Sequence, residues 1–331
     1  SKTPMLLILL LHISQALVIL TAGQVLGKLP FIQVRGRFNT LFLGLCGLII
    51  LSNLAALFLP INAYFHAVLL LAALLFQIKK GGFRNLKSFL FQTNILWIVI
   101  PVLLLSIGIP NHGDSDFYHA QALQWAEQYP VIPGLGNFFG RLAFNSSFFR
   151  VQALFSLHPF SAYSSHYLNS FLVAVVLVYF FATGCKTSHP RSQRLLAIGF
   201  GLCTLVIGRG WVSSVAPDVC AGIMMIWLAW NLALHFLFNH TPNRFLIGLV
   251  FVCGVMIKLS VVLYLPLIIA IWLPLNKSRF IQIMLLTACF IPWLIQNFIL
   301  SGYWVYPYFT DGITQPDWQV PAAQALLERQ T

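Results

Sequence analysis

The stretch "FLFQTNILWIVIPVLLLSIGIPNHGDSD", residues 89–116, decides the fold of this chain. Residues 89–109 contain no charged side chain, and a helix needs about 20 mostly apolar residues to cross a bilayer. The run therefore predicts a membrane-spanning helix. Asp114 and Asp116 follow shortly after its end, and the whole chain has only 7 acidic residues. We therefore expect the loop that begins at this membrane exit to have a function.

The composition indicates that the rest of the chain also lies in a lipid bilayer. The 331 residues are 59% hydrophobic and 8% charged, whereas soluble domains carry about 25% charged residues. Several further apolar runs are long enough to cross a bilayer. The sequence thus predicts an all-α, polytopic transmembrane bundle of about ten spanning helices, at residues 5–26, 40–60, 62–78, 89–109, 166–184, 193–209, 218–238, 244–257, 259–275 and 280–300.

Two of these spans are short and adjacent. Residues 244–275 form either one long tilted helix or two short helices that meet near Lys258. Basic residues flank both ends of the segment, which favours a hairpin that starts and finishes on the same side of the membrane. Helices of about 14–16 residues, at 1.5 Å per residue, do not fully cross. We therefore expect a recess on the outer side with Lys258 at its rim.

The basic residues set the expected orientation. Most of the 19 Lys and Arg residues fall in alternate loops, which we assign to the cytoplasmic side because basic loops stay inside. A formal charge of +12 suggests nucleic-acid binding in a soluble protein, but these loops account for it, so no nucleic-acid partner is expected. The six cysteines show no spacing typical of a disulfide framework or a metal site. All acidic residues then fall on the outer side: Asp114, Asp116, Glu127, Asp218, Asp311, Asp317 and Glu328.

Residues 110–165 are the one long loop, and we expect it to be ordered. Residues 116–128, "DFYHAQALQWAEQ", mix apolar and polar side chains at helical spacing, as an interfacial helix does. Residues 130–149, "PVIPGLGNFFGRLAFNSSFF", place Pro, Gly and Asn turn formers between aromatic residues. This second segment is typical of a rigid re-entrant or surface loop. Long ordered loops in compact proteins are usually functional.

The predicted topology gathers charged and polar side chains at one membrane–water boundary. Such a set suits group transfer from a lipid phosphate, in which a carboxylate takes a proton from an acceptor hydroxyl and cations hold the phosphate. Arginine suits a phosphate because its planar fork binds bidentately, whereas lysine acts as a point charge. The candidate residues are Asp114, Asp116, His119, Arg141, Arg209, Asp218 and Lys258.

The carboxylates also have simpler interpretations. Asp114 precedes a helix and can act as its N-cap, and Asp218 follows a proline and can cap the next helix. Asp116 in a first helical turn can complement the helix dipole. Asp116 and His119 share a helix face, and with His112 they offer three ligands for a divalent cation. Three ligands at this spacing are a weak signal, so no metal site is assigned.

The cations have simpler interpretations as well. A lysine in an apolar run either faces a cavity or partner, or extends to the interface, and both readings apply to Lys258. Arg209 at a helix end fits the second reading equally well. Arg141 and Arg150 can be plain surface charges, and Asn145 begins "NSS", which matches a glycosylation acceptor.

These features together resemble the GT-C superfamily, the polytopic glycosyltransferases that use polyprenyl-phosphate-linked sugars. The resemblance rests on an acidic loop after a helix exit, two amphipathic stretches, and six more helices with a buried "K-x-S" at residues 258–260. It implies a seven-helix module over residues 89–301, preceded by three N-terminal helices in residues 1–88. The acid motif here is "DSDFYH" rather than a pair of adjacent acids, and no soluble outer domain follows residue 301.

Longer blocks also resemble a narrower family of bacterial multi-pass membrane proteins without an assigned activity. These blocks are "GDSDFYH", the "PGLGNxxGRLxFNSS" pattern at residues 133–147, and "SGYWVYPYFTD" at residues 301–311. Proteins of that family are longer, so residues 302–331 are expected to be an incomplete outer-side segment. The resemblance implies a cell-envelope protein of the bacterial inner membrane with its site facing outward.

The resemblance implies a function and a role for each candidate. The protein is expected to transfer a sugar, with inversion, from a polyprenyl-phosphate donor to an acceptor outside the cytoplasm. Asp114 or Asp116 then acts as general base, and Lys258 holds the lipid phosphate, with Arg209 by positional analogy. The 131–150 loop, including Arg141 and Asn145, shapes the sugar or acceptor pocket, to which His119 and Asp218 contribute. The alternatives are a non-catalytic subunit among other membrane subunits, and a transporter or flippase for lipid-linked solutes.

Overall fold

The structure is a computed structural model that describes residues 5–29, 32, 34–80, 93–108, 112–160, 167–308 and 315–330. These residues form fourteen α-helices and three shorter turns of π- or 3₁₀-helix, so the predicted all-α fold class is confirmed. Residues 110–111 and 161–165 of the predicted loop, residues 89–92, 109 and 166 of the predicted spans beside it, and Asp311 lie outside the described residues.

Six helices are long and apolar enough to cross a membrane, which makes the chain an integral membrane protein. The other predicted spans correspond to shorter or less apolar helices: α5 (Thr93–Ser106), α10 (Arg191–Gly208), α12 (Arg244–Ile257), and η3 (Leu259–Tyr264) continued by α13 (Leu265–Trp272). The six candidate spans are α1 (Met5–Leu26), α2 (Arg37–Ala56), α3 (Ala63–Lys80), α9 (Leu168–Cys185), α11 (Pro217–Phe238) and α14 (Lys277–Ser301).

Local sequence explains where several helices begin and end. The side chains of Asn243 and Asn276 accept hydrogen bonds from backbone N–H groups of the first turns of α12 and α14, as N-cap residues do. Helix α14 ends at Gly302, whose φ of +80° is the left-handed conformation that glycine adopts most easily. Lys258 has an extended backbone (φ −150°, ψ 124°) and so ends α12. The predicted interruption at Lys258 is confirmed.

Helices α12 and α13 form the expected hairpin. Arg244, in the first turn of α12, donates from Nε to the carbonyl oxygen of Ile271 near the end of α13, at 3.0 Å. Residues 242–246 line one cavity together with Asn276, Ser278, Arg279 and Gln282, so both ends of the hairpin lie at the same end of the bundle. Lys258 lies at the opposite end of the hairpin.

The hydrophobic core lies between α2, α9, α11 and α12, and it is rich in aromatic rings. Phe42 of α2 stacks on Trp227 of α11 at 5.2 Å between ring centroids, and Phe180 of α9 meets Trp230 edge-on at 5.3 Å. Helix α2 also packs against α1, α8, α12 and α14. The predicted N-terminal segment 1–88 and the predicted module 89–301 therefore share one core.

Helices α1 and α2 approach so closely that glycine is required at their crossing. A Cβ atom at Gly44 would lie 1.8 Å from the carbonyl oxygen of Ile19. Small residues allow such backbone contact between membrane helices. We expect Gly44→Val to destabilise the protein by about 1–3 kcal/mol and to lower its thermal midpoint in detergent.

Gly199 of α10 provides the control, because no atom lies within 4 Å of its Cβ position. Gly199→Val should leave the midpoint near that of the wild type. Equal losses of stability in the two variants would contradict the close-approach explanation.

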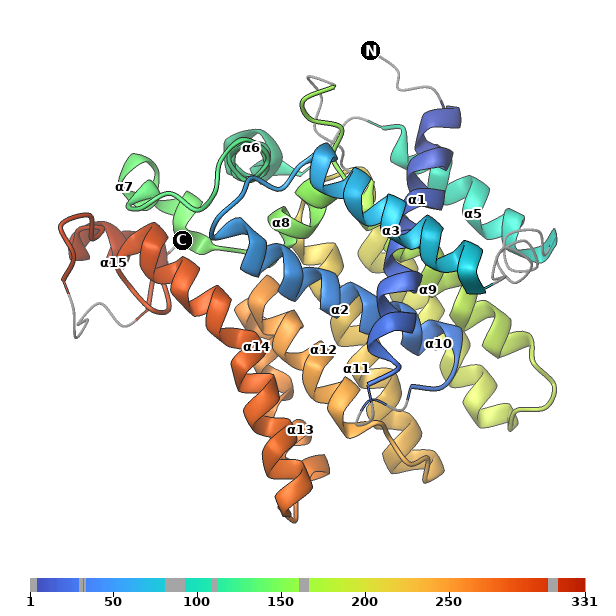
Figure 1. Cartoon of the computed structure of the whole chain (residues 1–331). Helices are drawn as coiled ribbons and strands as arrows, with labels where there is room; N and C mark the ends of the chain where they lie inside the picture. The colour runs from blue at the N-terminus through green and yellow to red at the C-terminus, as the bar shows by residue number, and fades with distance from the viewer. Residues whose placement is uncertain are drawn as a thin grey trace.

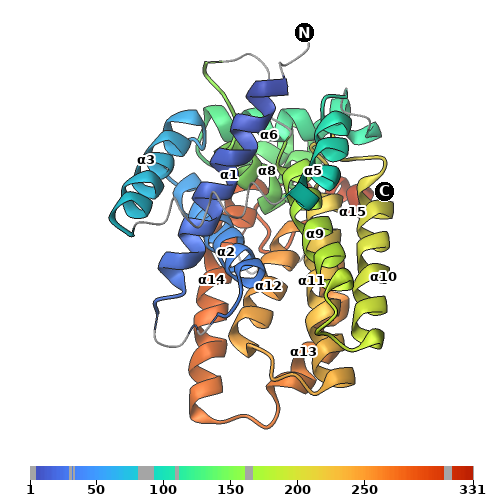
Figure 2. The same ribbon diagram turned by 90° about the vertical axis from the view of Figure 1, so that its right-hand side faces the viewer.

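One end of the bundle is covered by short helices: η1 (Ser115–His119), α6 (Ala120–Gln128), α7 (Leu135–Phe138), η2 (Gly140–Phe144), α8 (Ser147–Leu154) and α15 (Ala322–Gln330). Figure 1 shows α6 almost along its axis while α9, α11 and α14 run down the page, and Figure 2 shows α6 lying across the bundle. This geometry is that of the predicted interfacial helix. Every residue of α8 is buried, so the segment enters the bundle and the surface-loop alternative is wrong for it.

Charges separate along the bundle axis. We call the end covered by the short helices the acidic end, because the acidic residues of the described chain lie there. The charges of Asp114, Asp218 and Glu328, for example, all act on Tyr118. The opposite end is basic, since Arg35 and Arg37 share a cavity with Lys186, and Arg35 shares another with Arg244 and Arg279. The predicted segregation of acidic from basic residues is therefore present in the fold.

Candidate functional site

Asp114 is placed by an unusual helical turn. It precedes η1, a π-helical turn that continues into α6, and π-helical turns occur frequently at functional sites. Asp114 occupies the N-cap position, but its side chain makes no capping hydrogen bond, so the simple capping interpretation is wrong. Instead, its Oδ1 lies 3.6 Å from Nη1 of Arg141, and the side chain is 40% exposed. The carboxylate is thus both held and accessible.

Arg141 joins two distant segments. Besides Asp114, its Nε lies 3.6 Å from Oε2 of Glu328 in α15. Its guanidinium also lies over the rings of Phe117 and Tyr118, at 5.2 and 5.7 Å from their centroids. Burial, followed by the charge of Asp114, raises the pKa of Tyr118 to about 12. Two carboxylates, Asp114 and Glu328, thus oppose the charge of Arg141.

The approach of α15 explains one glycine of the 133–147 block. A Cβ atom at Gly140 would lie 2.5 Å from Oε1 of Glu328. A larger residue at this position would therefore force the Glu328 side chain to shift from its place beside Arg141. Glu328 was not among the residues to which the sequence assigned a role, and no local pattern marks it, because the two segments are far apart in the chain.

Two histidines lie beside Asp114. The ring centroids of His112 and His119 are 5.2 Å apart, and Nδ1 of His112 accepts a hydrogen bond from the backbone N–H of Asp114 at 3.1 Å. His119 is buried, and within the described part of the chain its Nδ1 has no hydrogen-bond partner. Burial, followed by the nearby His112, lowers the pKa of His119 to about 4, although Asp114 opposes this shift. His119 is therefore neutral at neutral pH.

These residues form the one cation-ligand group found in the described chain. Ligand atoms of His112, Asp114 and His119 all lie within 4.8 Å of one another. The predicted set was wrong in one member, because Asp116 is not part of it. Ligands about 2.1 Å from a tetrahedral ion lie about 3.4 Å apart, so the group has to contract before it holds a small cation. The three side chains are thus possible ligands for a divalent cation, and no metal site is assigned to them.

Lys258 and Asp218 form a second charged pair at the acidic end. Nζ of Lys258 donates to Oδ1 of Asp218, and the two side chains are 45% and 29% exposed. Asp218 lies in the first turn of α11, after Pro217, and does not occupy the N-cap position, so the capping interpretation is wrong for it too. Both charges act on His119. The structure thus brings together four predicted residues, Asp114, His119, Asp218 and Lys258, with Arg141 beside them.

Three predicted residues lie differently. Asp116 is exposed on η1, and Arg209 is exposed at the end of α10; among the described residues neither makes an ion pair with the cluster. Asn145 is buried. Its side-chain Nδ2 donates to the backbone carbonyl oxygen of Trp293 at 3.1 Å, and its backbone carbonyl oxygen accepts from the indole N–H of Trp293 at 2.8 Å. These two hydrogen bonds attach the loop to α14. Because Asn145 is buried, the "NSS" motif at residues 145–147 is not an accessible glycosylation acceptor.

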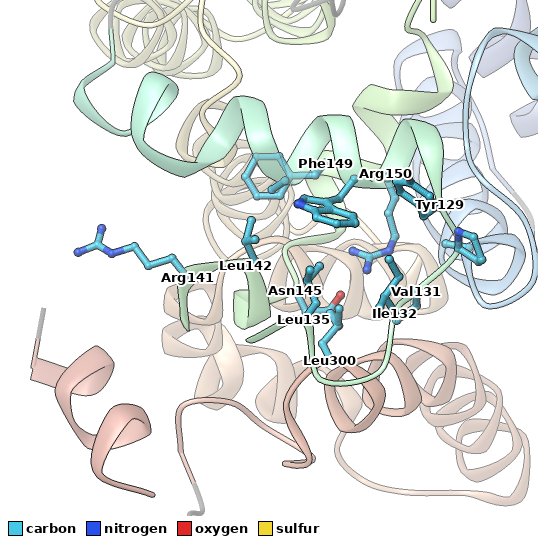
Figure 3. A pocket seen from close by; sticks show the side chains of 15 residues that line it. Tyr129, Val131, Ile132, Leu135, Arg141, Leu142, Asn145, Phe149, Arg150 and Leu300 are labelled. Carbon is cyan, nitrogen blue, oxygen red and sulfur yellow. The ribbon is translucent and has the colours of Figure 1, made fainter. Parts of the chain in front are cut away.

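A pocket borders this cluster. Phe149, whose ring centroid lies 5.4 Å from that of His119, forms one wall. Arg150 lies beside it on α8 and is 8% exposed, so the surface-charge interpretation of Arg150 is wrong. Figure 3 shows Arg150 directed into the pocket, whereas Arg141 extends away from it.

The neutral state of His119 predicts a pH dependence of stability. Its pKa is about 4 in the fold against 6.5 when unperturbed, so the unfolded chain takes up the proton first. The contribution of His119 is complete above pH 6.5 and decreases as the pH falls towards 4, by about 3 kcal/mol in all. We expect the thermal midpoint in detergent to fall less in His119→Gln than in the wild type between pH 7.5 and 5. Equal decreases would contradict burial of a neutral His119.

The fold and the site define an α-helical integral membrane protein with a charged cluster at one end of its bundle. The chain belongs to the family described as "Domain of unknown function (DUF8201)", whose sequence model matches residues 5–331. No curated protein and no solved structure matches it. The family description names no activity, and no glycosyltransferase family is indicated.

Proposed function

We propose that this protein is a membrane-embedded glycosyltransferase that moves a sugar, with inversion, from a polyprenyl-phosphate donor to an acceptor. The observation that carries the proposal is the position of Asp114. Its carboxylate is accessible, lies 3.6 Å from Arg141, and shares one end of an apolar helical bundle with the Lys258–Asp218 pair. A base and a phosphate-binding cation at a membrane boundary are the groups that such a transfer requires.

Asp114 takes the base role in preference to Asp116. The acceptor hydroxyl gives its proton to the Asp114 carboxylate while its oxygen forms a bond to the anomeric carbon of the donor sugar. The bond from that carbon to the phosphate oxygen breaks, and polyprenyl phosphate leaves with the electron pair. Arg141 fixes the carboxylate, and neutral His119 does not compete for the proton at neutral pH.

Lys258 stabilises the leaving phosphate. An ammonium group has three donors, so Lys258 can keep its bond to Asp218 and still donate to a phosphate oxygen. Arg209 is the proposed second cation, because it lies two residues before Trp211, whose ring centroid is 5.0 Å from that of His112. The proposal places the acidic end outside the cytoplasm, because the basic end then faces inward.

The proposal extends to the fold and the location. The shorter helices α5, α10 and α12, and the η3–α13 segment, then accompany the six candidate spans in a GT-C-like bundle of about ten. The expected partners are the polyprenyl-phosphate sugar and membrane lipids, and the expected location is the bacterial inner membrane. Support comes from the hairpin at Lys258, which leaves the lysine exposed at the acidic end.

Native mass spectrometry of the gently solubilised protein tests the donor site. The wild type should carry a co-purified polyprenyl phosphate or its glycosylated form, and Lys258→Met should lose it. Lys186→Met, an exposed lysine at the basic end, serves as the matched control and should retain the lipid. Bulk phospholipid alone, equal in all three proteins, would remove the support for the donor site.

A further inference from the structure

The Arg150 side chain combines burial with the lack of a counter-charge. It is 8% exposed on α8, a helix buried along its whole length. Among the described residues, no carboxylate forms an ion pair with it and no hydrogen bond reaches its guanidinium. A buried charge is strongly unfavourable unless an opposite charge or hydrogen bonds compensate it.

Arg150 is also charged at neutral pH. Burial lowers its pKa to about 10, which is still well above 7. Arg150 is therefore a full positive charge in a buried place, and no group of the described residues forms an ion pair with it. Buried charges in membrane proteins mark ligand or ion sites by default.

The space in front of Arg150 has the properties of a small binding pocket. Its volume is about 40 Å³, and a water molecule requires about 10–15 Å³ on this measure, so it admits one small headgroup. The acid on the neighbouring helix, Glu127, is not among the residues that line it. The walls are mainly apolar and aromatic, from Trp125, Tyr129, Val131, Leu135, Phe149 and Leu300.

Asn145 adds a polar group at the same place. Among the described residues, its Oδ1 is buried without a hydrogen-bond partner, and Asn145 and Arg150 line the same pocket, as Figure 3 shows. Because Oδ1 is an acceptor, it can receive a hydrogen bond from a hydroxyl of the bound group, whereas Arg150 supplies the donors for the oxyanion. Arg150 and Asn145 are thus polar side chains among mainly apolar walls; Arg141 lines the pocket as well, but its side chain extends away from it. A planar guanidinium binds two oxygens of one phosphate or carboxylate at once.

We infer that this pocket is an oxyanion-binding site, with Arg150 as its anchor, for the phosphate-type headgroup of a ligand. Phe149 stands between this pocket and His119 of the Asp114 cluster, and Arg141, the ion-pair partner of Asp114, lines the pocket as well, so the two sites are neighbours. The apolar walls of the pocket suit a headgroup that is attached to an apolar chain. A lipid headgroup and free phosphate both present an oxyanion, and this is the group that Arg150 binds. The inference does not rest on sugar transfer.

Binding to the full chain in detergent tests this site at constant ionic strength and pH 7.5. The probes are inorganic phosphate, geranyl phosphate and, as the neutral control, geraniol. We expect an oxyanion to stabilise the wild type against heat, and Arg150→Met to raise its dissociation constant at least tenfold. Arg191→Met, an exposed arginine at the basic end, should bind as the wild type does. Binding of geranyl phosphate alone identifies a lipid headgroup, and equal binding of inorganic phosphate identifies a free anion.

A measurement on the wild type covers the case in which Arg150→Met does not fold. A geranyl phosphate analogue with a photoreactive diazirine in its chain labels residues near its binding site, and peptide mass spectrometry locates the labelled residues. Label should fall on residues 125–150, which include walls of the pocket, and excess geranyl phosphate should reduce it at least tenfold. Unaltered affinity in Arg150→Met, absence of oxyanion binding by the wild type, or absence of label from residues 125–150 would each overturn the inference.

Discussion

Asp114→Asn should abolish most turnover of the sugar donor while leaving the protein folded and lipid-bound. The substitution keeps the shape of the side chain but removes the group that accepts the proton. A positioned general base contributes about 10²–10⁴-fold to a rate, so we expect a loss in this range in kcat. The measurement is release of polyprenyl phosphate from a defined donor by the protein in proteoliposomes.

Asp116→Asn is the matched control for this effect. Asp116 has the same chemistry two residues away but is exposed on η1, outside the group formed by His112, Asp114 and His119. Its removal should change turnover less than threefold. Comparable losses in the two variants would mean that the loop needs both charges and would contradict Asp114 as the single base.

Lys258→Met should weaken donor binding, whereas Asp218→Asn should not weaken it. Loss of Lys258 removes the cation for the phosphate and leaves Asp218 without its partner, so the donor dissociation constant should rise at least tenfold, consistent with charged hydrogen bonds of about 1.5–3 kcal/mol. Loss of the Asp218 charge frees Lys258, so donor binding should stay the same or become tighter. Titration of the solubilised protein with a short-chain donor measures both.

The change in donor binding in Asp218→Asn distinguishes a phosphate-binding role of Lys258 from a purely structural role of the Lys258–Asp218 pair. If the Lys258–Asp218 pair only joined α11 to the end of α12, either substitution would weaken the same contact. Both variants would then lower the thermal midpoint and weaken donor binding together. That parallel result would contradict a phosphate role for Lys258.

Much of the fold was predictable because the membrane imposes strong rules. A spanning helix has to be long and apolar, so runs such as residues 5–26 and 168–185 are visible in the sequence alone. The interruption at Lys258 was predictable from helix length and from basic residues on both sides of the hairpin. The burial of α8 was not, because its eight residues include Arg150 and have no uniform apolar pattern.

The sequence predicted most residues of the candidate site, but it did not predict which of them contact one another. Sequence placed Asp114, Asp218 and Lys258 at one depth, since each lies next to a helix end on the same side. It did not show that Arg141 would hold Asp114, that Glu328 would reach Arg141 from α15, or that Asp116 would lie apart. Such contacts depend on how the short helices pack, and no spacing rule determines that packing. A lone arginine within the aromatic and apolar residues 148–155 was the available signal for Arg150.

Turnover of a defined donor by the wild-type protein tests the central claim most directly. Polyprenyl-phosphate-linked sugars, each of known anomeric configuration, are incubated with proteoliposomes, and mass spectrometry and NMR follow the released lipid and sugar. The account predicts that at least one donor yields one polyprenyl phosphate per sugar transferred, to an acceptor or slowly to water, with inverted anomeric configuration. Intact donors throughout, with the lipid bound but unchanged, or a product of retained configuration would contradict it.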